Sequence, residues 1–358
     1  MNQRVLGFDL ARAYAIFGMF IVNFSFCFGT FGGGSFLEKF QFLFIGNASS
    51  VFIILAGLGL TLMVRNQDST SEQKAKIKKV VLKRSWFLFG VGLLLYSWWP
   101  GDILHFYGGY LHIAAYILFI PKKYYLWLIL AVVVIYHLLL LIIPVSTGWN
   151  YVTSEYLDFW TPIGFLRNTL YNGWNSILPW ISFFFLGMWL GRLNWNEKKV
   201  KRNLFLVAIV SLVAFKGLKI AASYNKFSEN VNFYMKQEYS PIVLPFMIIT
   251  ASCAILVILL SIYISEKFQS LKIIKYLTAT GKMSLTLYVF HITIGMIVLS
   301  RLTGKSYTGL YSTGVPASAE FIMTYVIVIY TFCVFFCVQW SKKFKKGPLE
   351  MLMRKISD

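Results

Sequence analysis

Three polar side chains in the first long apolar stretch of the sequence could take part in chemistry: Asp9, Arg12 and Asn23. Ionisable groups at membrane depth are costly, so they usually face a partner, a cavity or a substrate path. A spacing of three residues places Asp9 and Arg12 on one helix face, close enough to pair. Asn23 follows about 16 Å further along a helix. One helix is therefore expected to present an ion pair near one membrane surface and an amide near the other.

A second group of polar residues follows a chain break at Pro100 and Gly101. Asp102 and His105 are three residues apart and fall on the first turn of the next apolar stretch, where an acidic residue favours a helix start. Histidine is the usual general base near neutral pH, and a neighbouring carboxylate can orient it. The pair predicts either general-base chemistry or a helix cap beside a structural histidine, and Asp102 can serve both purposes.

The other three histidines are weaker candidates. His112 lies seven residues after His105 on the same helix face, where bonding to a neighbouring helix is the simpler interpretation. His137 stands in an otherwise apolar run and is expected to be structural. His291 lies in the middle of a later run and is the second candidate for a role in a cavity.

The composition indicates a membrane protein of the all-α class. Of the 358 residues, 58% are hydrophobic and 13% are charged, whereas soluble domains have about 45–50% apolar and about 25% charged residues. A bilayer-spanning helix needs about 20 apolar residues. The sequence predicts a polytopic protein of about ten transmembrane helices, near 8–30, 42–64, 85–99, 103–120, 124–144, 176–193, 203–222, 241–265, 281–300 and 319–340.

The net charge of +20 is explained by topology. With the N-terminus placed inside, 26 of the 34 lysines and arginines fall on the inner side of the ten runs and eight on the outer side. This asymmetry follows the positive-inside rule and predicts that both termini are cytoplasmic. A nucleic-acid partner is not expected, although the basic inner face would also suit an anionic cofactor.

The chain is expected to form a single integral-membrane domain over residues 1–358. Its four cysteines lie in apolar stretches without the spacing of metal ligands, so no metal site is expected. The outer segment 145–175 is rich in Trp, Tyr, Asn and Gly. It is typical either of a lid that binds sugars or lipid head groups or of an ordinary aromatic belt at the membrane interface.

Two further residues mark the inner ends of later helices. Gly187 and Gly191 form a pair of small residues that lets helices approach closely, and Arg192 ends that run at the inner surface. Lys282 begins the ninth run. Packing alone explains the glycines, whereas an anion site at Arg192 is a separate hypothesis.

Taken together, these segments resemble the YeiB-like and heparan-α-glucosaminide N-acetyltransferase-like family of membrane acyltransferases. The matching pieces occur in the same order along the whole chain. They are Asp9-Leu-Ala-Arg12 with Val22-Asn23, Gly101-Asp-Ile-Leu-His-Phe-Tyr-Gly108, Leu178-Pro179 with Gly187 and Gly191-Arg192, Gly281-Lys-Met-Ser-Leu-Thr-Leu-Tyr288, and Gly347-Pro-Leu-Glu-Met-Leu-Met-Arg354.

The resemblance implies transfer of an acyl group, most simply acetyl, from cytoplasmic acyl-CoA to an amine or hydroxyl on the other side of the membrane. In the heparan enzyme an Asn at the end of the first span works with a His in the loop that follows. Asn23 matches the Asn, but residues 24–50 contain no histidine. His105, oriented by Asp102, is therefore the expected base, and Asn23 the expected donor to the developing oxyanion.

The same resemblance suggests where acyl-CoA binds and what accepts the acyl group. The expected contacts for the acyl-CoA phosphates lie on the inner face, at Arg12 with its partner Asp9, Arg192 and Lys282. The expected acceptor is a sugar, an envelope glycan or a lipid head group, and the expected location is a bacterial plasma membrane, among its lipids.

The alternative is a transporter or flippase of an amphiphilic envelope molecule, and an inactive scaffold is a third possibility. The small-residue faces suit internal packing and a homodimer equally well.

Overall fold

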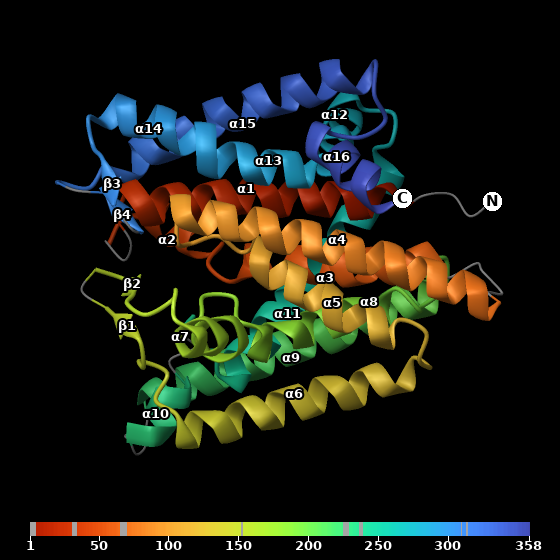
Figure 1. Ribbon diagram of the computed structural model, residues 1–358, viewed down its shortest axis with the longest axis horizontal. Helices are drawn as coiled ribbons and strands as arrows, with labels where there is room; N and C mark the ends of the chain where they lie inside the picture. Colours follow the sequence, from red (N-terminus) through yellow and green to blue (C-terminus); the bar gives the residue numbers. More distant parts are fainter. Residues whose placement is uncertain are drawn as a thin grey trace.

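Helices form nearly all of the regular structure in the computed structural model, which describes residues 5–30, 34–64, 70–151, 153–224, 229–235, 239–308, 310–312 and 314–358 (Figure 1). Within these ranges the strands form two short antiparallel hairpins, β1 (Trp149–Asn150) with β2 (Glu155–Tyr156) and β3 (Tyr307–Thr308) with β4 (Tyr311–Ser312). The all-α fold class is confirmed.

Eight helical stretches in the described part of the chain are long and apolar enough to cross a membrane. Several of the predicted runs continue beyond their expected ends or are divided by short irregular turns. The eight are α1 (Leu6–Phe28), α2 (Phe36–Phe42) with α3 (Asn47–Val64), α4 (Ser71–Trp98), α6 (Lys123–Ile142), α9 (Lys198–Tyr224), α11 (Leu244–Lys267), α13 (Ser284–Phe290) with the π-helical turn η2 (His291–Gly295) and α14 (Met296–Thr303), and α15 (Ala319–Ser341).

The two remaining predicted runs are helical but shorter than expected. α5 (Leu104–Ile117) and α8 (Ile177–Leu190) each have 14 residues, which is about 21 Å of helix against a hydrocarbon thickness of about 30 Å. α5 is shortened at its end, because residues 118–120 form a turn instead of continuing the helix. The protein is thus a polytopic helical membrane protein in which two helices are too short to cross a bilayer of average thickness.

The connections lie at two opposite ends of the helix bundle (Figure 1). We call the end where α1 begins the inner end; α12 (Lys272–Gly281) and α16 (Pro348–Ser357), near the C-terminus, lie there too. The opposite end, which we call the outer end, carries both hairpins and α10 (Glu229–Met235). The chain continues from the first hairpin into α7 (Pro162–Arg167) and the π-helical turn η1 (Asn168–Asn172). Residues near both termini therefore share one end, and their cytoplasmic location stays a prediction from the charge distribution.

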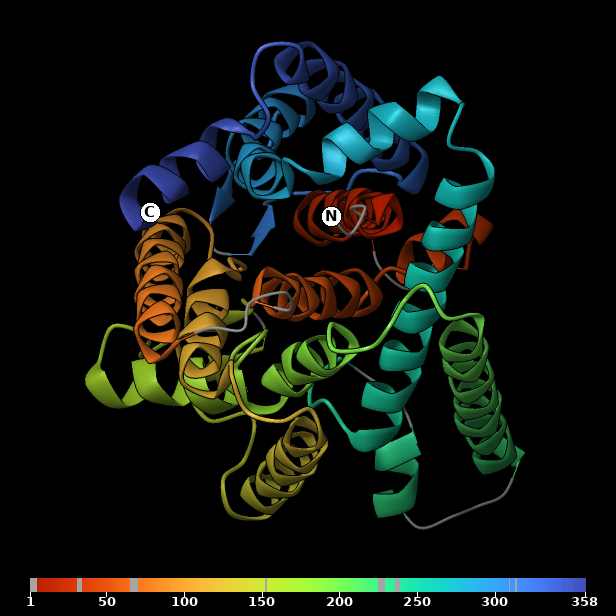
Figure 2. The same cartoon turned by 90° about the vertical axis from the view of Figure 1, so that its right-hand side faces the viewer.

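The centre of the bundle is formed by α1 and α3, which are surrounded by other helices (Figure 2). Much of α1 is buried, including Ala11, Ile16 and Phe20 with no exposed surface. α6 and α9 lie at the periphery, and only 17% and 11% of their most apolar windows are buried. Their apolar side chains are therefore available to lipid.

Glycines set the distance between α3 and α8. A Cβ atom on Gly187 would lie 2.0 Å from the Ile54 carbonyl oxygen, and one on Gly57 would lie 2.1 Å from the Phe184 carbonyl oxygen. A Cβ atom on Gly191 would lie 1.9 Å from the hydroxyl of Thr61. No side chain fits at these contacts, so the predicted close approach at Gly187 and Gly191 is confirmed.

Candidate active site

A cavity of about 600 Å³ lies in the outer half of the bundle. We call it the outer cavity. Its wall combines residues of α1, α2, α3, α9, α11 and α13 with the α2–α3 and α4–α5 connections, the segments just before α8 and α11, and the β3–β4 hairpin. The wall is mainly apolar, and its polar side chains include Asn23, Ser49, Asn175, Lys219, Tyr239, Ser240 and Tyr288.

Asn23 forms a hydrogen bond with a histidine of another helix at the edge of this cavity. Its amide nitrogen Nδ2 lies 2.9 Å from Nε2 of His291, whose Nδ1 lies 3.3 Å from the Leu287 carbonyl oxygen. A carbonyl can only accept, so the pattern assigns the proton to Nδ1 and leaves the lone pair of Nε2 to accept from Asn23. An imidazole lone pair at this position is a proton acceptor beside the cavity.

The position of His291 is set by the wide turn η2. Its ring stacks on Phe20 with centroids 4.7 Å apart and meets the edge of Phe24 at 5.9 Å. The hydroxyl of Tyr325 donates to the Gly295 carbonyl oxygen at 2.5 Å, which supports the turn. Turns of this type are rare and occur often at functional sites. His291 has no exposed surface, and Asn23 separates it from the cavity.

Asp102 both caps α5 and holds a tyrosine in the cavity wall. Its Oδ2 accepts from the backbone N–H groups of Leu104 at 2.8 Å and His105 at 3.4 Å, which confirms the predicted cap. Its Oδ1 accepts from the hydroxyl of Tyr288 at 3.1 Å, and that hydroxyl accepts from the Ile103 N–H at 3.0 Å. Tyr288 is one turn before His291, so this network also positions the helix that carries the histidine.

His105 meets Asp102 as predicted but does not line the outer cavity. Its Nδ1 lies 3.4 Å from Asp102 Oδ2, both side chains are fully buried, and its Nε2 has no hydrogen-bond partner in the described part of the chain. The ring is enclosed by Phe106 at 3.8 Å and the edge of Tyr96 at 5.6 Å. The structure therefore brings Asp102 and His105 together, and brings Asn23 to His291 instead.

The other two histidines have hydrogen-bond partners away from the outer cavity. His112 on α5 is half-buried and lies 3.4 Å from the hydroxyl of Ser85 on α4, in line with the expected bond to a neighbouring helix. His137 lies 2.8 Å from the Val133 carbonyl oxygen on its own helix. Tyr288 was not among the candidate site residues; in the sequence it only ends one of the segments that carry the family resemblance, three residues before His291.

The four residues expected to contact acyl-CoA occupy the inner half. Arg12 pairs with the buried Asp9 at 2.8 Å, as predicted, and reaches the Leu55 carbonyl oxygen at 3.3 Å. Arg192 donates to the Leu118 carbonyl oxygen at 2.6 Å. Lys282 follows directly after α12 and is half-buried. None of the four lines the outer cavity.

Glu350 on α16 caps the helix that carries Tyr288 and His291. Its carboxylate accepts from the backbone N–H of Leu285 at 2.8 Å, and from Thr286 at 3.2 Å through the backbone and 2.6 Å through the hydroxyl. Burial raises the pKa of this carboxyl, against the lowering effect of the hydrogen bonds from Thr286 and Leu285. The C-terminal helix thus fixes the start of α13.

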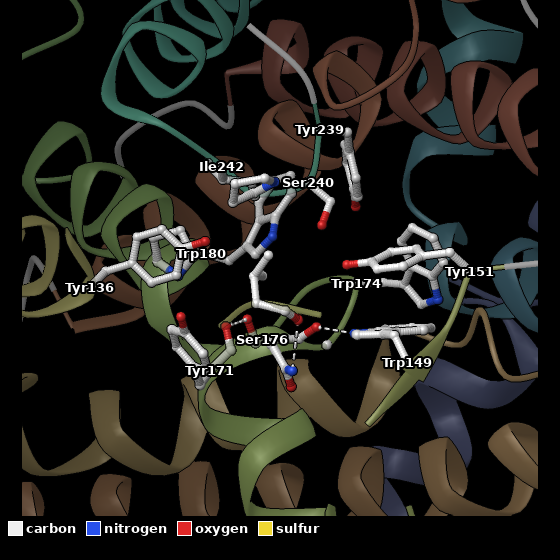
Figure 3. Close-up of a pocket in the computed structure, with 15 residues that line it drawn as sticks. Tyr136, Trp149, Tyr151, Tyr171, Trp174, Ser176, Trp180, Tyr239, Ser240 and Ile242 are labelled. Carbon is white, nitrogen blue, oxygen red and sulfur yellow. Dashed lines mark hydrogen bonds between the residues drawn. The ribbon is translucent and has the colours of Figure 1, made fainter. Parts of the chain in front are cut away.

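A small aromatic pocket adjoins the outer cavity, and both share Trp174, Tyr239 and Ser240 in their walls. Figure 3 shows Trp149 beside Trp174, with centroids 4.9 Å apart, and the Trp149 N–H donating to the Asn172 carbonyl oxygen at 2.8 Å. The volume of about 20 Å³ holds one water molecule. The segment 145–175 is therefore packed over the outer end of the bundle near the cavity.

The fold and the site define an integral membrane protein with a proton-accepting imidazole and an amide at an internal cavity. The family described as heparan-alpha-glucosaminide N-acetyltransferase, catalytic, matches residues 4–227. The chain belongs to this family of transmembrane N-acetyltransferases. A second family, described only as a protein of unknown function (DUF418), matches residues 188–358. No curated protein matches the chain.

Proposed function

We propose that this protein transfers an acetyl group from cytoplasmic acetyl-CoA to an amine or hydroxyl acceptor in the outer cavity. The observation that carries the proposal is the hydrogen bond of 2.9 Å between Asn23 and His291 at the cavity edge. Acyl transfer needs a group that removes a proton from the acceptor and a donor for the oxyanion. The imidazole and the amide have these two capacities.

The two residues perform both roles through an exchange of partners. An acceptor hydroxyl or amine donates to Nε2 of His291 in place of Asn23, and the released amide then donates to the thioester oxygen. As the imidazole takes the proton, the acceptor atom bonds to the carbonyl carbon. The C–S bond then breaks, and the protonated imidazole returns the proton to the departing thiolate of CoA. Holding both reactants in one cavity supplies a further part of the acceleration.

In this proposal His291 takes the role that the resemblance assigns to a histidine in the first loop of the heparan enzyme. Residues 24–50 contain no histidine, but α13 and η2 bring one to Asn23 from the other half of the chain. We therefore propose His291 as the base in place of His105. Asp102 and His105 act as positioning residues, because their network holds the Tyr288 hydroxyl in the cavity wall.

In this proposal the phosphates of acetyl-CoA are bound by basic residues at the inner end of the bundle. Arg12, oriented by Asp9, lies about 16 Å along α1 from Asn23. Arg192 and Lys282 follow the ends of α8 and α12, which lie at the same end of the bundle. The extended pantetheine arm would pass between helices from these cations to the amide. We place the protein in a bacterial plasma membrane, with a sugar, envelope glycan or lipid head group as acceptor.

The test is the release of CoA thiol from acetyl-CoA by the purified protein, compared with acetyl-CoA binding by calorimetry. His291→Ala is expected to lower kcat about 10²- to 10⁴-fold, and Asn23→Ala about 10²-fold, with binding unchanged. His137→Ala, a histidine on a peripheral helix, is the control and should retain activity. Wild-type turnover in His291→Ala would exclude the base assigned here.

Saturable acetyl-CoA binding separates this proposal from its main alternative. A transporter or flippase of an amphiphilic molecule would also have a large cavity, but it needs no acyl donor. Absence of acetyl-CoA binding, together with lipid movement across vesicles, would favour the transporter.

A further inference from the structure

One side of the outer cavity reaches the lipid-facing surface of the bundle. Three of its wall residues are exposed: Ser240 before α11, Phe42, the last residue of α2, with 57% of its surface accessible, and Lys219 in the outer part of α9. Large apolar residues are exposed on or next to the same helices and at the start of α11, namely Phe36, Leu43, Leu218, Ile220 and Leu244, although Lys39 and Lys216 are exposed as well. A surface of this composition in a polytopic protein contacts acyl chains rather than water.

The helix that borders this side is the least buried of the eight long helical stretches described. α9 packs mainly on α11 and lies at the edge of the bundle (Figure 2). Lys219 is about 31 Å along α9 from Lys198, close to the outer membrane surface, and Asn23 is about 25 Å along α1 from Leu6. The cation, the opening and the amide are therefore at a similar depth.

The polar groups in the wall suit an anionic ligand that is rich in oxygen. No carboxylate is among the residues described in the cavity wall, whereas Lys219 contributes a positive charge. Three buried N–H donors of wall residues have no hydrogen-bond partner in the described part of the chain: Nδ2 of Asn175, Nε1 of Trp174 and Nε1 of Trp99. Asn175 is only 2% exposed, and a buried donor without an acceptor is costly unless a ligand satisfies it.

We propose that the acceptor is a membrane lipid whose head group carries a phosphate and a free hydroxyl or amine, and that it enters from the outer leaflet between Phe42 and Lys219. This inference rests on the proposed function. Lys219 binds the phosphate, and Asn175 and Trp174 donate to the oxygens of the head group. The cavity, at about 600 Å³, is in the range of sites for ligands of this size.

The apolar wall then receives the upper part of the acyl chains, through residues such as Phe44 and Phe246. The head-group oxygen or nitrogen reaches His291 Nε2, loses its proton there and bonds to the acetyl carbonyl carbon. The C–S bond breaks and CoA leaves as the thiol with that proton. The product is an O- or N-acetylated lipid that leaves by the same side.

The experiment reconstitutes the full chain in phosphatidylcholine vesicles with and without phosphatidylglycerol, which supplies a phosphate and free hydroxyls. Radiolabelled acetyl-CoA is added together with a water-soluble amino sugar as the competing acceptor, and label is counted in the organic phase and in the acetylated sugar. Retention of phosphatidylglycerol by the purified protein is measured separately by native mass spectrometry. The variants are Lys219→Gln, Lys219→Arg as the charge-conserving rescue, and Lys216→Gln as a matched control three residues away that does not line the cavity.

Label is expected in the organic phase only with phosphatidylglycerol present. Lys219→Gln should lower both this signal and lipid retention roughly tenfold, as for loss of a hydrogen bond to a charged group, while Lys219→Arg and Lys216→Gln should leave them near the wild-type values. Equal lipid retention in Lys219→Gln and Lys216→Gln overturns the proposal. Transfer only to a water-soluble amino sugar also overturns it, but preserves the acyltransferase.

A further outcome distinguishes the lipid site proposed here from the acetyltransferase reaction proposed above. Retention of phosphatidylglycerol that depends on Lys219, without any consumption of acetyl-CoA, supports the lipid site and rejects the proposed enzymatic reaction.

Discussion

At the scale of single residues, the polar contacts in this protein are of two kinds: between residues close in the sequence, and between residues that only the fold brings together. The pair Asp9 and Arg12 and the cap formed by Asp102 follow from a spacing of three residues or fewer, so the sequence was sufficient to predict them. The hydrogen bond between Asn23 and His291 joins residues 268 positions apart. Spacing carries no signal for such a contact, and His291 could be ranked only second among candidates from sequence.

The Tyr288 hydroxyl is the residue-scale link between Asp102 and the cavity. In Tyr288→Phe, the Ile103 N–H and one Asp102 oxygen lose their partner. We expect the free energy of unfolding to fall by about 1–3 kcal/mol and turnover to fall with it, measured by thermal denaturation in detergent and by CoA release. Tyr116→Phe removes a hydroxyl from a ring that is 59% exposed and should change neither quantity. An unchanged melting temperature in Tyr288→Phe would contradict this role.

At the scale of elements, hydrophobic runs located every one of the ten predicted helices, because a bilayer-spanning helix must be apolar for most of its length. Their bounds were less predictable. α5 and α8 are shorter because side chains that continue the apolar run, such as Leu118, Ile120 and Leu193, belong to turns rather than to the helix. Apolar composition cannot separate a turn packed on the bundle from the last turn of a helix.

The contact between α3 and α8 gives a prediction about helices rather than side chains. Gly187→Ala places a Cβ atom where the Ile54 carbonyl oxygen lies 2.0 Å away, so the helices must separate. We expect a loss of about 1–3 kcal/mol in stability, or more if the backbone cannot move, seen as a lower melting temperature. Gly217→Ala on α9 has no atom within 4 Å of the new Cβ and should be neutral or stabilising. Equal effects of both substitutions would contradict this contact as the cause.

At the scale of the whole molecule, the distribution of basic residues along the sequence agrees with the positions of the helix connections at the two ends of the bundle. Sorting the lysines and arginines by side relied on the ten runs, and the structure places the connections between the described helices at two opposite ends, as that sorting requires. Arg4, Arg65, Lys226 and Lys236, which entered the sorting, lie outside the described residues. The cavity could not be predicted at this scale, because it arises where segments from several helices fail to fill the space between them.

Orientation can be measured with single cysteines in a cysteine-free variant. Lys76→Cys lies in an exposed position near the start of α4, and Tyr151→Cys lies in the outer segment at a site that is 54% exposed. In intact cells a membrane-impermeant thiol reagent is expected to label Tyr151→Cys, and to label Lys76→Cys only after the membrane is opened. The opposite pattern would invert the topology and the direction of acetyl transfer.

The contact between Asn23 and His291 has a consequence for how such chains can change over generations. The amide lies in the segment matched by the acetyltransferase family, and the imidazole lies in the segment matched only by the family of unknown function. Neither segment alone contains both groups, so a truncated gene product of either kind would lack half of the pair. Under the proposed mechanism neither segment is sufficient without the other, and a relative with a histidine in its first loop is expected not to need one at the position of His291.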